Sequence, residues 1–289
     1  MRLPPEFVRE LLDQMDSVAR RGGRVTDAEA NRLVGRAARV AFVVPAAAPF
    51  AAALRAALHD ARTTAASKRT RAQRWSHASV RFEVAASWFA ALLQERPLGA
   101  GAPLPLERQV LAEGPRVLVP GVCEAVVFDA SPWGAGAILY RGKVAQEVLV
   151  VDWTPTLCSE LGVVRGQSAF LSYLEAFTVL AALAVWCRPG GRRWLAIVGD
   201  NVAALTVAVS QRGKGDLGKI CREVALRQAR LGLEIAVGHL SSSLNTHADA
   251  LSRLTAPSPA DWPEELVRLP RHSLPSMDEL FWLGRPVVD

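Results

Sequence analysis

Carboxylates able to hold metal ions stand at four separated places in the C-terminal half of the chain. Asp129 and Asp200 each follow a short apolar run typical of a buried β-strand, and Asp249 lies in the first turns of a predicted short helix. Glu175 is the only charge in the apolar segment 170–187. Ligands of α/β proteins collect outside the carboxyl ends of strands, so side chains at such ends can lie side by side.

Each of these carboxylates, taken singly, also has a structural interpretation. Asp129 precedes Ser-Pro-Trp-Gly and suits a turn, while Asp200-Asn201 precedes a predicted helix and suits an N-cap. Asp249 suits the helix dipole as a first-turn acid. If Glu175 lies on an exposed stripe of its helix, it needs no partner. If it is buried, the cost of burying a charge requires a partner or a metal ion, and the segment itself contains no Lys or Arg.

Taken together, the four carboxylates predict a site for two divalent ions. Converging carboxylates repel one another strongly, and cations between them remove that cost. Oxygen ligands favour Mg²⁺ or Mn²⁺ over zinc. Two such ions, about 3.5–4 Å apart, activate water and stabilise the leaving oxygen in phosphodiester hydrolysis.

The elements that position these residues are predicted from hydrophobic periodicity and turn signals. Three strands are followed by a helix, a strand, two helices, a strand and a short helix, which predicts an α/β fold with a mixed sheet and flanking helices. The predicted ranges are 125–128, 134–140 and 144–151 for the first strands, 170–187 for the long helix, 194–198 and 233–240 for the later strands, and 202–211, 216–231 and 246–254 for the remaining helices.

Four sequence segments resemble the RNase H domain of retroelement reverse transcriptases, most closely that of LTR-type and tyrosine-recombinase-type retrotransposons. They are FDASPWGAGAIL (128–139), LEAFTVLAAL (174–183), VGDN (198–201) and HLSSSLNTHADALSR (239–253). The resemblance extends from Cys123 to Leu254 and implies a mixed five-stranded sheet. It also implies that Asp129 binds both metal ions, with Glu175 and Asp200 on one side and Asp249 on the other.

The same resemblance implies hydrolysis of the RNA strand of an RNA–DNA hybrid, leaving 3′-hydroxyl and 5′-phosphate ends. Such a hybrid is recognised by its shape and its 2′-hydroxyls. His239 matches a family histidine that moves protons or releases product, although the Leu-Ser-Ser-Ser that follows departs from the family's usual Gly-containing turn. Asn201 and Asn245 are expected to contact the nucleic acid. Only Arg212 and Lys214 stand where some relatives insert a basic protrusion, so affinity must come from elsewhere.

Basic residues are concentrated in the first half of the chain. Residues 1–120 contain 18 Lys/Arg and 11 Asp/Glu, a net charge of +7, whereas residues 121–289 contain 16 and 17, a net charge of −1. A basic half predicts a polyanionic partner, and a codon-driven Arg bias is the alternative. The run Lys68, Arg69, Arg71 and Arg74, followed by an aromatic residue, suits nucleic-acid binding, and a solvated helix face is again the alternative.

Composition shifts predict four regions. Residues 1–96 are expected to form a helical segment that resembles, more weakly, the thumb or connection of the same polymerases, through Asn31-Arg-Leu-Val-Gly-Arg and the step from Val44-Pro to Pro49-Phe. A Pro/Gly-rich linker (97–120), the RNase H-like domain (121–255) and a Pro-rich tail without clear elements (256–289) follow. No Tyr-x-Asp-Asp motif is present, so any polymerase partner would be another part of the same polyprotein. A catalytically decayed, nucleic-acid-binding remnant of that polyprotein is the alternative.

The remaining composition predicts an intracellular protein of the cytoplasm or nucleus. Four cysteines without CxxC spacing fit a reducing compartment, and the N-terminus lacks the apolar region of a signal peptide. Segment 170–187 approaches membrane length, but a mid-span carboxylate favours a buried core helix over a membrane span. No motif indicates an oligomeric state.

Overall fold

The computed structural model describes residues 3–44, 47–63, 71–93, 124–188, 194–211, 213 and 215–281. The chain divides into two compact units, Met1–Ala112 and Glu113–Asp289. The predicted linker at 97–120 lies outside the described residues, as do Arg212 and Lys214. Each unit is therefore described by itself.

Unit 1 is helical in its described part. Thr26 and Glu29 form a reciprocal capping box that starts the second helix, and proline occupies the first turn of the first and third helices. Phe50, Phe82 and Phe89 are fully buried between the helices. The helices are α1 (Pro5–Arg20), α2 (Asp27–Val43), α3 (Ala48–Arg62) and α4 (Arg71–Leu93).

Unit 2 is built on a mixed sheet, which confirms the predicted α/β class. The described strands form one six-stranded sheet in the order β5-β4-β1-β2-β3-β6. The first three strands make an antiparallel meander, and β4 and β5 continue parallel to β1. The strands are β1 (Glu124–Ala130), β2 (Gly134–Arg141), β3 (Val144–Asp152), β4 (Trp194–Gly199), β5 (Glu234–His239) and β6 (Arg271–His272).

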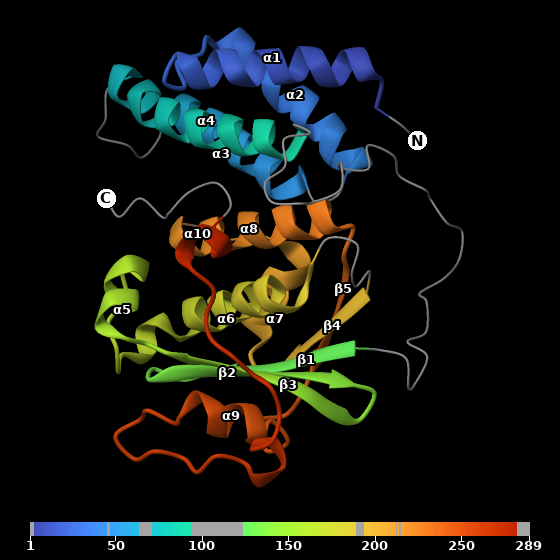
Figure 1. Ribbon diagram of the computed structural model, residues 1–289. Helices are drawn as coiled ribbons and strands as arrows, with labels where there is room; N and C mark the ends of the chain where they lie inside the picture. Colours follow the sequence, from blue (N-terminus) through green and yellow to red (C-terminus); the bar gives the residue numbers. More distant parts are fainter. Residues whose placement is uncertain are drawn as a thin grey trace. The chain divides into compact units, whose positions relative to one another are not determined.

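The helices of unit 2 cover the two faces of this sheet unequally (Figure 1). Most of them lie on the face to which Val126 and Phe128 point, and they share a large apolar core with it. The single short helix α9 (Thr246–Ser252) lies on the opposite face, where Val127 and Ile138 belong to a much smaller cluster. The helices of the first face are α5 (Pro155–Leu161), α6 (Leu171–Trp186), α7 (Val202–Ser210), α8 (Gly215–Leu231) and α10 (Met277–Leu280).

The C-terminal segment corrects two expectations. The tail was expected to hold no clear element, yet it contains a 3-10 turn, η3 (Glu264–Leu266), as well as β6 and α10. β6 pairs in parallel with β3, so the sheet has six strands where five were expected. These elements escape a periodicity argument because they are only two to four residues long and gain their stability from tertiary contacts, such as Phe281 stacking on Phe177.

One described segment, Ser168–Trp186, is long and apolar enough to cross a membrane by length and composition alone. It includes α6, whose side chains pack into the core against the sheet. Glu175 in its first turns is buried. The packing is that of a core helix, as the sequence predicts.

Candidate metal centre

Strand pairing brings Asp129 and Asp200 together. β1 and β4 run parallel with Val127 opposite Val198, so two residues further on the same register aligns Asp129 with Asp200. Alternation along both strands places these two carboxylates on the face that α9 covers. Gly199 allows this close approach, because a Cβ atom there would lie 2.8 Å from the Phe128 ring.

Glu175 reaches the same place from α6. Its side chain is only 3% exposed, so the interpretation as an exposed-stripe residue is wrong. Desolvation raises the pKa of Glu175 to about 8, a hydrogen bond from the Asn201 side chain opposes this rise, and repulsion from Asp129 and Asp200 adds to it. A buried carboxyl group that interacts with two others is the arrangement that the metal-site hypothesis requires.

Asp129 is the centre of the carboxylate group. Its side chain is 7% exposed, and desolvation raises its pKa to about 6. Ser252 donates a hydrogen bond from Oγ to Asp129 Oδ2 at 2.7 Å, which stabilises the charged form, whereas Asp200 and Asp249 both raise the pKa further by repulsion. All four predicted carboxylates therefore act on one another electrostatically through Asp129 or Glu175.

Two glycines of β2 let α9 sit close enough to bring Asp249 to this group. A Cβ atom on Gly136 would lie 2.3 Å from Leu251 Cβ and 2.8 Å from the Ala248 carbonyl oxygen. A Cβ atom on Gly134 would lie 3.0 Å from the Ser252 carbonyl oxygen. Gly136 pairs with Asp129 across the β1–β2 ladder, so the part of the sheet without side chains on which α9 packs lies next to the central carboxylate.

Asp249 is held by a neighbouring cation. Arg253, the residue that ends α9, donates a hydrogen bond from Nε to Asp249 Oδ1 at 2.7 Å. The two side chains are 51% and 43% exposed, so this is an ion pair open to solvent. The charge of Arg253 also lowers the pKa of Asp129, which places the guanidinium within electrostatic reach of the central carboxylate.

His239 ends β5 beside the β4 strand end. It pairs with Gly199, the residue before Asp200, and its side chain is exposed. Alternation along β5 puts it on the face of Ile235, which packs against the large core, whereas Asp129 and Asp200 lie on the α9 face. The structure therefore brings the backbone of His239 to the site without directing its side chain at the carboxylates.

Asn201 and Asn245, which are predicted to contact nucleic acid, both make hydrogen bonds within the protein. Asn201 caps α7 by accepting from Ala203 N at 2.8 Å, and its side chain also bonds Glu175. Asn245 is 2% exposed and donates from Nδ2 to the Phe128 carbonyl oxygen at 3.0 Å. Asn201 thus lies next to Glu175 and lowers its pKa, and Asn245 holds the strand end before Asp129.

The basic run proposed for nucleic-acid binding falls largely beyond what the structure describes. Lys68 and Arg69 lie outside the described residues, and for Arg71 and Arg74 only the backbone, at the start of α4, is described. Arg62, a basic neighbour on α3, is already neutralised, because its Nε and Nη2 atoms bind both carboxylate oxygens of Asp27 at 2.7 and 2.6 Å.

The donor set fits a divalent cation. Within the described part of the chain, no three His, Cys, Asp or Glu side chains stand close enough to hold one ion. The burial and charge of the individual carboxylates nevertheless suit a cation. Glu175 Oε2 is buried and has no hydrogen-bond partner. The raised pKa values of Asp129 and Glu175 come from desolvation and mutual repulsion, and a cation bound between them would relieve the repulsion.

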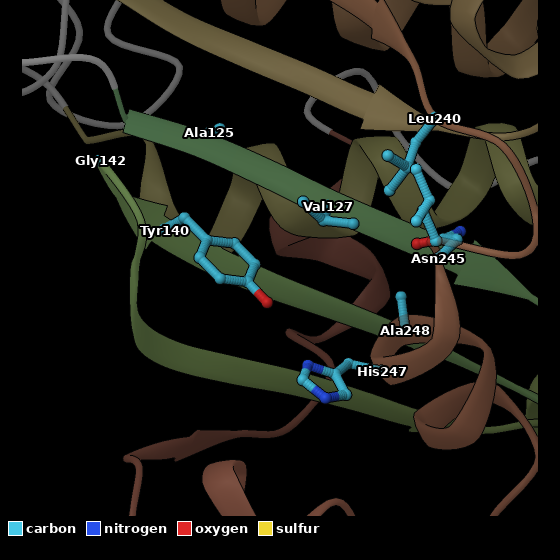
Figure 2. A pocket seen from close by; sticks show the side chains of 9 residues that line it. Ala125, Val127, Tyr140, Gly142, Leu240, Asn245, His247 and Ala248 are labelled. Carbon is cyan, nitrogen blue, oxygen red and sulfur yellow. The ribbon is translucent and has the colours of Figure 1, made fainter. Parts of the chain in front are cut away.

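A separate pocket of about 280 Å³ opens on the α9 face of the sheet (Figure 2). Its floor includes Val127, and its polar groups are the Tyr140 hydroxyl, the His247 ring and the amide of Asn245. None of its nine lining residues carries a carboxylate, so this pocket is distinct from the metal centre. Asn245 connects the two, since it lines the pocket and also binds the backbone next to Asp129.

Three residues of this centre were not predicted from the sequence. Ser252 and Arg253 lie inside the motif that identifies Asp249, and the i,i+4 spacing of Asp249 and Arg253 is a signal for their ion pair. Gly136 gives no comparable signal, because its role depends on which helix packs over it.

Comparison of the chain with protein-family models, curated proteins and solved structures finds no match.

Proposed function

We propose that unit 2 is a ribonuclease H-type endonuclease that hydrolyses the RNA strand of RNA–DNA hybrids with two Mg²⁺ or Mn²⁺ ions. The observation that carries the proposal is Glu175: a buried carboxyl group with an unpartnered oxygen, beside Asp129 and Asp200. The motif resemblance to retroelement RNase H domains and the meander-first mixed sheet support it. That resemblance also places the activity beside a polymerase from the same polyprotein.

The residues that would hold the ions are Asp129, Glu175, Asp200 and Asp249. Asp129 is the group on which the others converge electrostatically, which suits a carboxylate shared by two ions. Divalent ions bound there would activate a water and stabilise the charge that develops on the phosphate. Oxygen-only donors favour Mg²⁺ or Mn²⁺ over softer metals.

The protein's own contribution is to arrange these carboxylates before the ions arrive. Asn201 orients Glu175, and Ser252 orients Asp129 through its 2.7 Å hydrogen bond. Asn245 ties the start of the α9 segment to the strand end that carries Asp129.

A substrate panel tests this proposal. The purified full chain is incubated with Mg²⁺ and an RNA–DNA hybrid, a DNA duplex or an RNA duplex of the same sequence. We expect cleavage of the RNA strand of the hybrid only, with 3′-hydroxyl and 5′-phosphate ends. Cleavage of duplex DNA would indicate another nuclease activity, and binding of the hybrid without cleavage would support a decayed remnant.

A further inference from the structure

Arg253 is a half-exposed cation that contacts the carboxylate group through Asp249. Its Nε atom binds Asp249 Oδ1 at 2.7 Å, and its charge reaches Asp129. Among the described residues, Asp249 is the one acceptor that the guanidinium of Arg253 binds. The bond uses Nε and leaves the two Nη atoms out. Asp249 thus has two candidate partners, the guanidinium and a divalent ion.

The contact between Asp249 and Arg253 is easily broken. Both side chains are about half exposed, and an exposed i,i+4 ion pair shifts an equilibrium only about twofold. Arg165, on the loop before α6, is a contrast: its Nη2 atom binds both Asp152 Oδ1 and the Thr255 carbonyl oxygen. Arg165 is therefore fixed by two acceptors, whereas Arg253 is held by one carboxylate that also belongs to the metal centre.

We infer that Arg253 is a substrate-binding residue, which Asp249 holds until a divalent ion takes that carboxylate and frees the guanidinium to bind a phosphate of the nucleic acid. The inference depends on the proposed function. The planar, always charged guanidinium suits a phosphate, and it is half exposed beside the carboxylates. Cation occupancy and phosphate binding are thereby coupled through one side chain.

The first test measures competition for Asp249 without nucleic acid. Mn²⁺ is titrated into the full chain and its free concentration is followed by electron paramagnetic resonance. Removing the competing cation with Arg253→Ala should tighten Mn²⁺ binding about two- to fivefold. The matched control is Arg268→Ala, which removes an exposed positive charge from the same unit and should leave the affinity unchanged. Equal affinities for the parent and Arg253→Ala would overturn the competition.

The second test measures hybrid binding in an Asp200→Asn background, which keeps the hybrid intact and leaves Asp249 in place. Fluorescence anisotropy is recorded with Mg²⁺ and again with chelator. With Mg²⁺, Arg253→Ala should weaken binding about tenfold, the size of one charge-assisted phosphate contact. With chelator, its affinity should equal that of Arg268→Ala. An equal loss in both conditions, or no loss with Mg²⁺, would overturn the inference.

Failure of this inference is distinguishable from failure of the proposed function. If the parent chain cleaves the RNA strand but Arg253→Ala shows neither the Mn²⁺ effect nor the Mg²⁺-dependent loss, only the role of Arg253 falls. If the parent neither binds Mn²⁺ nor cleaves the hybrid, the proposed function is wrong, and so is the inference about Arg253. Matching thermal unfolding of the parent and Arg253→Ala excludes a folding defect as the cause.

Discussion

The two faces of the sheet in unit 2 are covered in very different ways. One face is buried under α6, α7 and α8 in a large continuous core. The other face carries α9 over a small cluster that includes Ile138, Val148 and Leu251. Asp129, Glu175 and Asp200 lie on or directly after β1, α6 and β4, which carry the large core, whereas Asp249 and Ser252 belong to α9 and Arg253 directly follows it.

This difference indicates how the carboxylate group is assembled. Three carboxylates are placed by elements that the fold cannot move without losing most of its buried apolar surface. The fourth depends on a short helix whose approach to the sheet requires the bare backbone of Gly136. The two faces can therefore be separated experimentally: damage to the first set should abolish chemistry, and damage to the α9 side should weaken it in graded steps.

The largest expected effect comes from Asp129→Asn, which removes the central charge. Cleavage should be lost while the fold is kept. Because desolvation, and after it repulsion from Asp200 and Asp249, raises the pKa of Asp129 to about 6, its ionised form destabilises the metal-free protein. At pH 7.5 the free energy of unfolding of metal-free Asp129→Asn should exceed that of the parent by about 1–2 kcal/mol.

The pH dependence of that gain checks its cause. A carboxyl group whose pKa is higher in the folded than in the unfolded chain binds more protons when folded, so metal-free stability falls as pH rises. Asp129 at about 6 and Glu175 at about 8 set the window between about pH 4 and 8. Urea unfolding at pH 4.0 should show almost no difference between the parent and Asp129→Asn. A gain of the same size at both pH values would argue against ionisation of the buried Asp129 as the cause.

A smaller effect is expected on the α9 side from Gly136→Ala. The added Cβ atom meets Leu251 Cβ at 2.3 Å and must push α9 outward. We expect cleavage about 100-fold slower, because a shift of about 1 Å in one ligand has that effect, and a stability loss of about 1–3 kcal/mol. Gly35→Ala on α2, where an added Cβ meets nothing within 4 Å, is the control. Parental activity of Gly136→Ala would show that the seating of α9 does not govern the site.

The two faces were also predictable to different degrees. Long apolar runs and alternating strands fixed the α/β class and the ranges of most strands and of α6, because burial of such patterns follows from elementary physical chemistry. The seating of α9 was not predictable, since Gly136 matters only through the helix packed on it. Asn201 and Asn245 were predicted to contact nucleic acid, and their hydrogen bonds to the start of α7 and to the Phe128 carbonyl oxygen were not foreseen, because residue type does not reveal which hydrogen bonds the fold supplies.

A change at His239 should have a further reduced effect. His239→Ala should slow turnover without abolishing it, by less than Gly136→Ala does, and leave Mn²⁺ affinity unchanged, because the exposed side chain is not directed at the carboxylates. The His239 side chain is exposed at the end of β5 and lies on the opposite face of the sheet from Asp129 and Asp200. Loss of Mn²⁺ binding in this variant, measured by titration, would make His239 a ligand.

The smallest expected effect lies in unit 1. Replacing Lys68, Arg69, Arg71 and Arg74 with Gln in the full chain should weaken hybrid binding about five- to tenfold. The slope of log K against log salt should also become shallower, because fewer phosphate contacts release fewer counterions on binding. Arg62→Gln is the matched control, since Asp27 already neutralises Arg62. An unchanged slope in the fourfold variant would favour an incidental Arg bias.

The central claim, that these carboxylates hydrolyse RNA in a hybrid, has one most direct test. A hybrid labelled differently on its RNA and DNA strands is incubated with Mg²⁺ and either the parent chain or Asp200→Asn, purified identically. We expect shortened RNA and intact DNA with the parent, and two intact strands with Asp200→Asn. Equal cutting by both proteins, or an intact RNA strand with the parent at high enzyme concentration, would contradict it.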